Sequence, residues 1–156
     1  MISKYKPVGG VERCSLYPAN AVEKALFSSE GCEVTLVGEP LEVELLDDMS
    51  NYEERTDSLK GDIRVSHLLN LVADREAAKA WLDKDFLDRA YLDGLVAQVL
   101  LADGRRLLVG YSALFGDEQP LRLESLISTS GTQLHDKPTV TLRLVSHDTE
   151  FACEII

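Results

Sequence analysis

Hydrophobic and polar residues alternate along most of the chain, and this pattern predicts a fold rich in β-strands. Successive side chains of a strand point to opposite faces, so a strand with one buried face alternates apolar and polar residues. Turn residues such as Gly, Pro, Asp and Ser separate the alternating stretches, which cover residues 11–17, 32–37, 41–45, 63–69, 121–127, 139–146 and 151–156. Together with the hairpin described next, they predict eight or nine short strands.

Two apolar runs, residues 95–102 and 106–111, flank Asp103-Gly104 in the middle of the chain. Asp-Gly is a strong hairpin signal, because a type I′ turn needs positive φ at both central residues. The first run is apolar on one face and only partly polar on the other, with Leu95, Ala97, Val99 and Leu101 against Val96, Gln98 and Leu100. We therefore expect both faces to be covered and the hairpin to lie in the middle of the β structure.

One segment, at about residues 75–92, has the spacing of an amphipathic helix. Asp74 precedes it as an N-cap and Gly94 follows it as a stop. Its apolar stripe consists of Ala78, Trp81, Leu82, Phe86 and Ala90. Trp81 and Phe86 at this spacing predict a face packed on the sheet rather than a cofactor site. Residues 18–27 fit either a short helical turn, with Pro18 at its first position, or a connection.

These elements predict a mainly β (α+β) fold, an antiparallel β-sandwich or barrel with one main flanking helix. At 156 residues the chain is expected to form a single domain, 1–156. Residues 1–10 are expected to be a flexible N-terminal arm. Residues 47–62 are polar and acidic without clear alternation, so we expect a long acidic loop. Loops of that length in compact domains usually serve function or interaction.

Charge and composition narrow the class of function. The formal net charge is −11, and residues 39–103 hold most of it. A sequence-specific nucleic-acid reader normally has a basic face, which disfavours that class. The first residues lack a secretory h-region, and no stretch reaches the length of a membrane span. Cys14, Cys32 and Cys153 are widely spaced, which predicts free, buried thiols in a reducing compartment such as the cytoplasm.

Histidine and carboxylate pairs are the first candidates for chemistry. His135-Asp136 and His147-Asp148 lie twelve residues apart, with His67 elsewhere, and such residues bind divalent metals. Adjacent strand residues point to opposite faces, however, and both pairs fall at loop or strand-end positions where polar residues are common. We therefore assign no metal site to them.

Other candidates also have a simpler structural explanation. Ser128, Ser130 and Gly131 lack the G-x-S-x-G context of a nucleophile elbow, and Cys153 with His147 fits packing better than catalysis. Gly9-Gly10 lacks the Lys-Ser/Thr of a phosphate loop. The acidic pairs Asp47-Asp48 and Glu53-Glu54 have no EF-hand spacing and are typical of a solvated surface. We therefore predict no catalytic, cofactor-binding or metal-binding residue, and a protein that is not an enzyme.

The order of elements resembles that of bacteriophage and prophage tail-tube proteins and related tail structural proteins. The features that carry this resemblance span most of the chain: Gly9-Gly10-Val11 before an early strand, the acidic Tyr52-Glu53-Glu54, the helix entering the 95–111 hairpin, Leu121-Arg-Leu-Glu124, Thr129-Ser-Gly131 and the closing Thr139-Val-Thr-Leu-Arg-Leu144.

The resemblance implies a β-sandwich or barrel with a flanking helix, which self-associates into rings that stack into a tube with an acidic lumen. In that family an extended loop also reaches the neighbouring subunit. The implied partners are further copies of the chain and other tail-type proteins, in the cytoplasm or in a virion-like particle. No cofactor, membrane or sequence-specific nucleic acid is implied.

Two alternatives from other classes remain open. A small-molecule-binding β-barrel would need a concave apolar interior with a few convergent polar groups. An enzyme on the same scaffold would need His67, His135 or His147 to converge with a carboxylate.

Overall fold

The protein is described by a computed structural model over residues 10–131 and 137–156. Within these ranges the chain forms strands β1 (Val11–Pro18), β2 (Val22–Ser28), β3 (Gly31–Leu36), β4 (Leu41–Glu42), β5 (Asn51–Leu59), β6 (Asp62–Asp74), β7 (Leu95–Leu101), β8 (Arg106–Val109), β9 (Arg122–Thr129), β10 (Thr139–Asp148) and β11 (Cys153–Glu154). The helical elements are the 3₁₀ helices η1 (Ala19–Ala21) and η2 (Ala77–Leu82) and the α-helix α1 (Lys84–Leu92).

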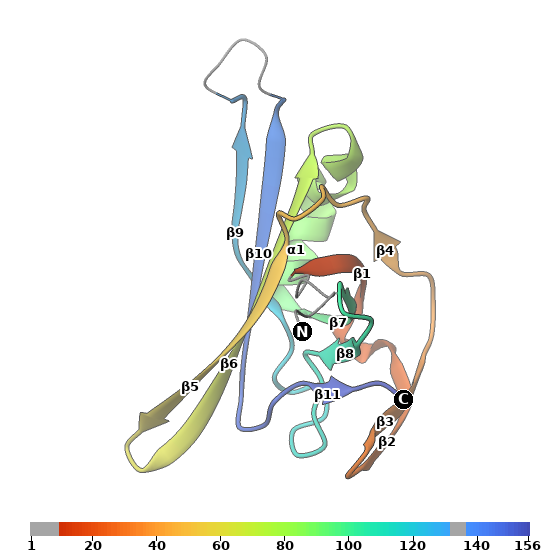
Figure 1. The fold of residues 1–156 in the computed structure, drawn as a ribbon, viewed down its shortest axis with the longest axis vertical. Coiled ribbons are helices and arrows are strands. Elements are labelled where there is room, and N and C mark those ends of the chain that lie inside the picture. The colour runs from red at the N-terminus through yellow and green to blue at the C-terminus, as the bar shows by residue number, and fades with distance from the viewer. Residues whose placement is uncertain (1–9, 132–136) are drawn as a thin grey trace, which may run out of the picture.

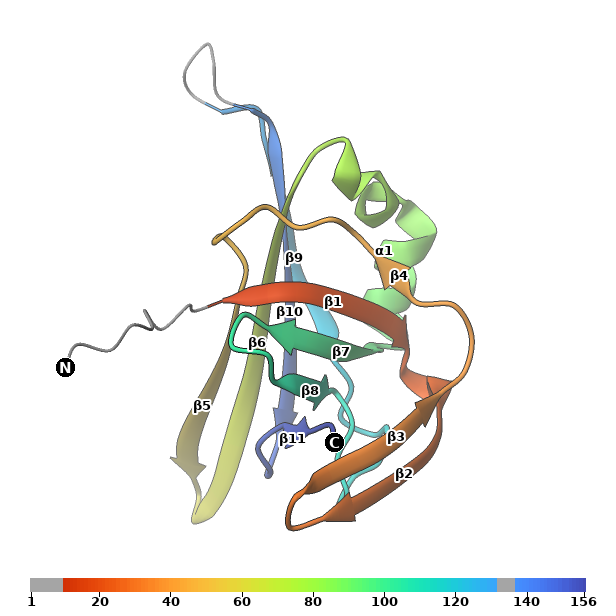
Figure 2. The ribbon, with the colours of Figure 1, turned by 45° about the vertical axis from the view of Figure 1, so that its right-hand side comes forward.

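The described strands form three antiparallel sheets. One has five strands in the order β11-β8-β7-β1-β4, a second has four in the order β5-β6-β10-β9, and β2 pairs with β3 in the third. Strands of the five-stranded sheet run across those of the four-stranded sheet, and α1 lies at one side of the pair (Figures 1 and 2). The predicted mainly β fold with a flanking helix is confirmed.

The main core fills the space between the two larger sheets. Leu69 and Leu71 of β6 and Leu142 of β10 meet Ala97 and Val99 of β7 there, and each of these side chains is almost fully buried. A second cluster lies on the opposite face of the five-stranded sheet, under the β2–β3 hairpin, and includes Cys32, Val96 and Leu108. Strand β7 therefore contributes to a core on each face, as its sequence predicts.

Strands β7 and β8 pair as the predicted hairpin, but their turn is not type I′. The Gly104 N–H donates to Leu101 O at 3.0 Å, and φ is positive at Gly104 (+94°) but not at Ala102 or Asp103. This is the three-residue loop in which an ordinary turn is followed by one left-handed residue. The two-residue turn with positive φ at both positions occurs instead at Lys60 (+51°) and Gly61 (+86°), between β5 and β6.

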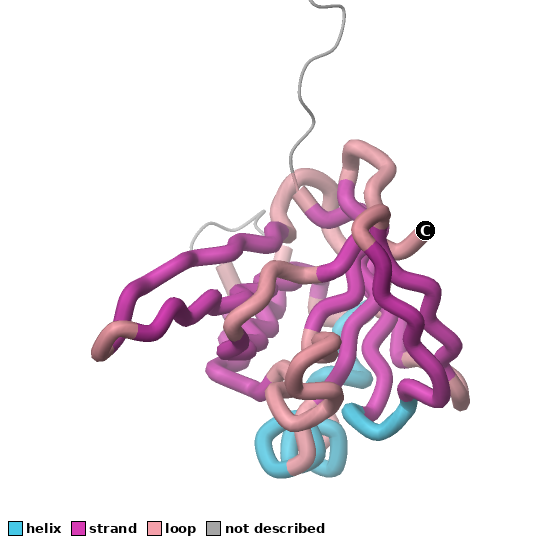
Figure 3. Tube along the Cα trace, turned by 90° about the horizontal axis from the view of Figure 1, so that it is seen from below, coloured by secondary structure: helices cyan, strands magenta, loops and turns pink. Residues whose placement is uncertain are grey.

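The prediction of an acidic loop at residues 47–62 is wrong for most of that segment. Residues Asn51–Leu59 form β5, which pairs with β6 along its full length. The β5–β6 hairpin extends away from the rest of the molecule (Figures 1 and 3), so its end has no core to cover. Apolar alternation is therefore missing from a segment that is nevertheless a strand. Residues 47–50 remain outside the strands, as expected.

The predicted helix at 75–92 is two helices. Asp83 has extended backbone (ψ 128°) and separates η2 from α1. The N-cap position of η2 is Glu76 rather than the predicted Asp74, although Asp74 Oδ1 accepts a hydrogen bond from the Ala77 N–H at 2.9 Å. Trp81 is 1% exposed in the main core and Phe86 packs against that core, which confirms their assignment.

Arg122, the first residue of β9, fastens the end of α1 to the four-stranded sheet. Its Nη1 donates to the carbonyl oxygens of Tyr91 (3.1 Å) and Leu92 (2.6 Å). The last carbonyls of a helix lack partners within the helix, so a cation at this end is favourable.

No described helix is long and apolar enough to cross a membrane.

Several strand boundaries differ from expectation. Strand β6 runs five residues beyond 69, because it crosses the whole of the sheet between β5 and β10. Strands β4 and β11 have two residues each and form the edges of their sheet. In residues 18–27 the helical turn is present as η1, but the rest of the segment belongs to strand β2, which neither open interpretation predicted.

The β7–β8 turn gives a test of backbone strain. We expect Gly104→Val to lower the free energy of unfolding by about 1–3 kcal/mol, because valine tolerates positive φ poorly. Ala102→Val is the matched control in the same turn, at a residue without positive φ, and should change stability by less than about 0.5 kcal/mol. Urea unfolding measures both, and equal losses in the two variants would contradict the turn geometry.

Candidate functional site

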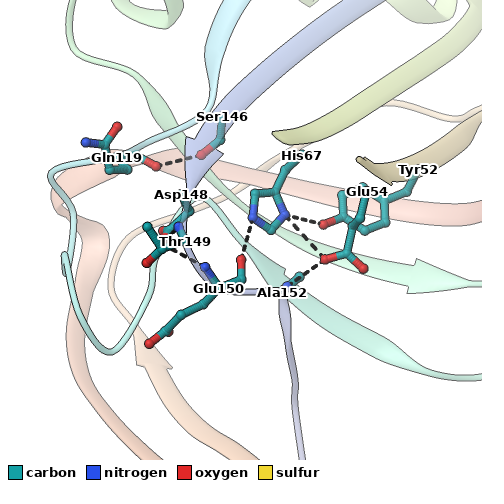
Figure 4. A network of polar contacts seen from close by, with 9 residues as sticks. All are labelled: Tyr52, Glu54, His67, Gln119, Ser146, Asp148, Thr149, Glu150 and Ala152. Atoms are coloured by element: carbon teal, nitrogen blue, oxygen red, sulfur yellow. Dashed lines mark hydrogen bonds and ion pairs between the residues drawn. The ribbon is translucent and has the colours of Figure 1, made fainter. Parts of the chain in front are cut away.

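The described residues bring one buried polar network together, at the junction of β5, β6 and the segment after β10 (Figure 4). His67 lies on the inner face of β6, between Val65 and Leu69, and is 4% exposed. The neighbouring strand β5 supplies Tyr52 and Glu54 on the same face, because residues two apart in a strand share a face.

Hydrogen bonds define the protonation of His67. Its Nε2 lies 2.9 Å from the carbonyl oxygen of Glu150, which can only accept, so Nε2 carries the proton. Nδ1 then accepts a hydrogen bond from the Tyr52 hydroxyl at 2.5 Å. Glu54 Oε2 lies 3.5 Å from Nδ1 and accepts the Ala152 N–H at 2.7 Å. The three side chains thus fasten residues 150 and 152 to the β5–β6 hairpin.

Burial keeps the side chains of His67 and Tyr52 uncharged. Burial lowers the pKa of His67, although the Glu54 carboxylate, the Glu150 carbonyl and Asp148 favour its protonated form. Burial and the nearby Glu54 raise the pKa of the Tyr52 hydroxyl. At neutral pH the histidine is therefore neutral and the tyrosine protonated. Both ring nitrogens of His67 have a partner within the protein, so the network fastens the segment after β10 to the β5–β6 hairpin.

Asp148 and Ser146 complete the junction from the end of β10. Asp148 is 6% exposed, and its Oδ1 accepts hydrogen bonds from the N–H groups of Thr149 (2.6 Å) and Glu150 (3.3 Å). The Ser146 hydroxyl donates to the carbonyl oxygen of Gln119 at 2.8 Å. These bonds shape the turn that carries the Glu150 carbonyl to His67.

An open polar cleft of about 340 Å³ borders the network. Its wall includes Tyr52, Glu54, Ala152 and Glu154 on one side and the β7–β8 turn with Asp103 and Arg105 on the other. The Arg105 Nε pairs with Asp103 Oδ2 at 2.9 Å, so the cation that faces this cleft is already paired. Small-molecule sites are mostly apolar and enclosed, and this cleft is neither.

His67 lies beside one carboxylate, that of Glu54, but the two described histidine candidates, His67 and His147, do not meet in one site. His147 is exposed on the outer face of the four-stranded sheet, where its Nδ1 lies 3.0 Å from the Ser66 hydroxyl. His67 points from the opposite face into the core, and Asp148 also points inward, away from His147. His135-Asp136 lies outside the described residues. Over residues 10–131 and 137–156, no group of three His, Cys, Asp or Glu side chains could hold a metal ion.

The nucleophile candidates are also separated. Ser128 accepts a hydrogen bond from Arg75 Nη1 at 2.8 Å, and the Ser130 hydroxyl donates to the adjacent Gly131 carbonyl at 3.2 Å. Cys153 lies in β11, in the cluster under the β2–β3 hairpin, whereas His147 lies on the outer face of the other sheet. These pairings leave none of the predicted candidates arranged for covalent catalysis.

The glycine and acidic pairs have structural positions. Gly9 lies outside the described residues, and the Gly10 carbonyl oxygen accepts a hydrogen bond from the Ala102 N–H at 3.0 Å. Asp47 and Asp48 are exposed. Glu53 and Glu54 point to opposite faces of β5, where Glu53 pairs with Arg55 on the exposed side and Glu54 turns towards His67.

Sequence reasoning missed the network, although part of its signal was present. His67 occupies an inward position between Val65 and Leu69, which marks a buried histidine that needs partners. Its two partners lie in the stretch that lacks apolar alternation and was expected to be a loop. The pairing of β5 with β6 is what brings Tyr52 and Glu54 to it.

Comparison of the chain with protein families, with curated proteins and with solved structures finds no match.

The lowered pKa of His67 makes stability depend on pH. Below about pH 6.5 the unfolded chain binds a proton at this histidine that the folded chain excludes, so stability falls as the pH drops towards the folded pKa. The loss approaches about 1.4 kcal/mol per pH unit in that interval. Urea unfolding from pH 7.5 to 5 measures it. His147→Gln should keep this slope and His67→Gln should flatten it, and equal slopes in these two variants would contradict the assignment.

The Tyr52 hydroxyl offers a second test of the network. Tyr52→Phe leaves the buried Nδ1 of His67 without its donor, so we expect a loss of about 1–2 kcal/mol of unfolding free energy. Tyr91→Phe is the control. Tyr91 is 63% exposed on α1, so removing its hydroxyl leaves no buried group without a hydrogen-bond partner. A loss of the same size in both variants would show that the Tyr52 hydroxyl has no special role.

Proposed function

We propose that this protein is a non-enzymatic structural subunit that associates with further copies of itself, in the manner of phage tail-tube subunits. The observation that carries the proposal is the pair of long open edges on the four-stranded sheet. Strand β5 is the outermost strand on one side and β9 on the other, with nine and eight residues. No described strand pairs with the outer side of either one.

Long open edges are unusual in a protein that functions as a monomer. Unpaired N–H and C=O groups along an edge strand are a template for pairing with another chain, and monomeric proteins keep such strands short. The five-stranded sheet follows that rule, because its edge strands β4 and β11 have two residues each. The four-stranded sheet departs from it on both sides.

The two edges differ in charge, which favours pairing between unlike edges. Strand β5 carries Glu53, Arg55 and Asp57 on one face, whereas residues 125–129 of β9 carry no charge. Pairing β5 of one copy with β9 of the next uses different surfaces on each copy. Such head-to-tail contacts close into rings or extend into filaments. This geometry agrees with the ring assembly that the resemblance to tail-tube proteins implies.

The acidic charge sets the conditions for assembly. Each copy carries a formal net charge of −11, so close packing of copies costs electrostatic free energy at low ionic strength. Salt reduces this repulsion, because the Debye length is about 10 Å at 0.1 M. Association should therefore strengthen with both salt and protein concentration.

Light scattering and analytical ultracentrifugation test the proposal. We expect oligomers or tubes that grow with protein concentration and with salt from about 0.02 to 0.5 M. Ile127→Lys places a charge on the open β9 edge, at a side chain that is 59% exposed, and should weaken association at least about tenfold.

Leu114→Lys is the matched control, because Leu114 is 63% exposed in the turn between β8 and β9 and adds the same charge away from both edges. It should leave association unchanged. A wild-type protein that stays monomeric under all these conditions would overturn the proposal and favour the small-molecule-binding alternative.

A further inference from the structure

Two cysteines that are far apart in the sequence lie side by side in the fold. Cys32 begins the buried face of β3, and Cys153 begins β11 near the end of the chain. Both pack in the cluster between the five-stranded sheet and the β2–β3 hairpin.

The backbone pairing places the two cysteines on adjacent strands, with Cys153 two residues out of register with Cys32. Cys32 forms a parallel bridge with Ile155, and the Ile156 N–H donates to the Cys32 carbonyl oxygen at 2.9 Å. Cys153 is two residues before Ile155 and therefore shares its face of the strand. A Cβ atom added at Gly31 would lie 2.3 Å from the Glu154 carbonyl oxygen, so β3 and β11 approach too closely for any side chain there.

The surroundings of the pair distinguish its members from the third cysteine. Cys32 is fully buried and Cys153 is half-buried, so an oxidant reaches Cys153 first. Cys14 is buried in the main core on the opposite face of the five-stranded sheet. Burial raises the pKa of the Cys32 thiol to about 12, with the neighbouring Cys153 as a further cause. The Cys32 thiolate is therefore scarce at neutral pH, and its reactions are slow.

We propose that Cys32 and Cys153 are a modification site, at which a small-molecule disulfide such as glutathione disulfide converts the two thiols into an intramolecular disulfide. In a reducing compartment the pair stays as two thiols. The bond would join the β2–β3 hairpin covalently to the last strand of the five-stranded sheet.

The reaction is two successive thiol–disulfide exchanges. The Cys153 thiolate attacks one sulfur of glutathione disulfide, which forms a mixed disulfide and releases one glutathione thiolate. The Cys32 thiolate then attacks Cys153 Sγ, which forms the Cys32–Cys153 bond and releases the second glutathione. Two protein thiols are oxidised, one small disulfide is reduced to two thiols, and the two protein protons pass to the released thiolates.

The bond should stabilise the fold because it closes a very long loop of the unfolded chain. Residues 32 and 153 enclose most of the sequence. A loop of that size reduces the entropy of the unfolded ensemble substantially, which corresponds to a rise in Tm of about 5–15 °C.

The experiment treats the full-length protein with glutathione disulfide at pH 8 under native conditions. Remaining thiols are then alkylated in denaturant, and the disulfide is mapped by non-reducing digestion and mass spectrometry. We expect one cross-linked peptide pair containing Cys32 and Cys153, an alkylated Cys14, and a higher Tm that returns to its starting value on reduction.

Three serine variants complete the test. Cys14→Ser should form the same bond with the same rise in Tm. Cys32→Ser should stop at a stable glutathione adduct on Cys153, and Cys153→Ser should form no intramolecular bond. A wild-type protein that keeps both thiols, links Cys153 between two copies, or uses Cys14 would overturn the proposal.

Discussion

Burial of β7 on both faces is the constraint on which the rest of the structure depends. Val96 is fully buried on one face, and Ala97 and Val99 are fully buried on the other. A strand of this kind cannot lie on a surface, so one layer must cover each side of it. The four-stranded sheet is the layer on one side and the β2–β3 hairpin is the layer on the other. Burial of apolar surface contributes about 25 cal/mol per Å², so covering β7 on both faces favours folding strongly.

Much of the fold could be predicted because this constraint is written in local patterns. The apolar residues on both faces of 95–101 mark a central strand, and the alternation in 139–146 marks β10 as half-buried. The helix was predicted as one segment because Asp83 and its neighbours are all compatible with helix. Its break depends on η2 and α1 packing against different strands, β6 and β9, which no local pattern contains.

The failures have a common physical origin in tertiary context. Strand β5 is held by backbone pairing with β6 and covers little core, so its sequence carries no apolar alternation. For the same reason the partners of His67 could not be identified, although the histidine itself stood at an inward position. The turn types also depend on how the strands pair. Asp103-Gly104 has the preferred composition for a type I′ turn, yet Lys60-Gly61 adopts that turn because β5 and β6 pair without an intervening bulge.

The crossing of the two sheets also creates a gradient of local stability within the molecule. Where the sheets overlap, opening a strand would expose core residues such as Leu69 and Leu142 and would approach the cost of global unfolding. The outer end of the β5–β6 hairpin is exposed on both faces and is held mainly by its own hydrogen bonds. Opening this end of the hairpin therefore costs less free energy than opening a strand where the two sheets overlap. The molecule thus combines a rigid centre with a hairpin end that can change its conformation on contact with another surface at little cost in folding free energy.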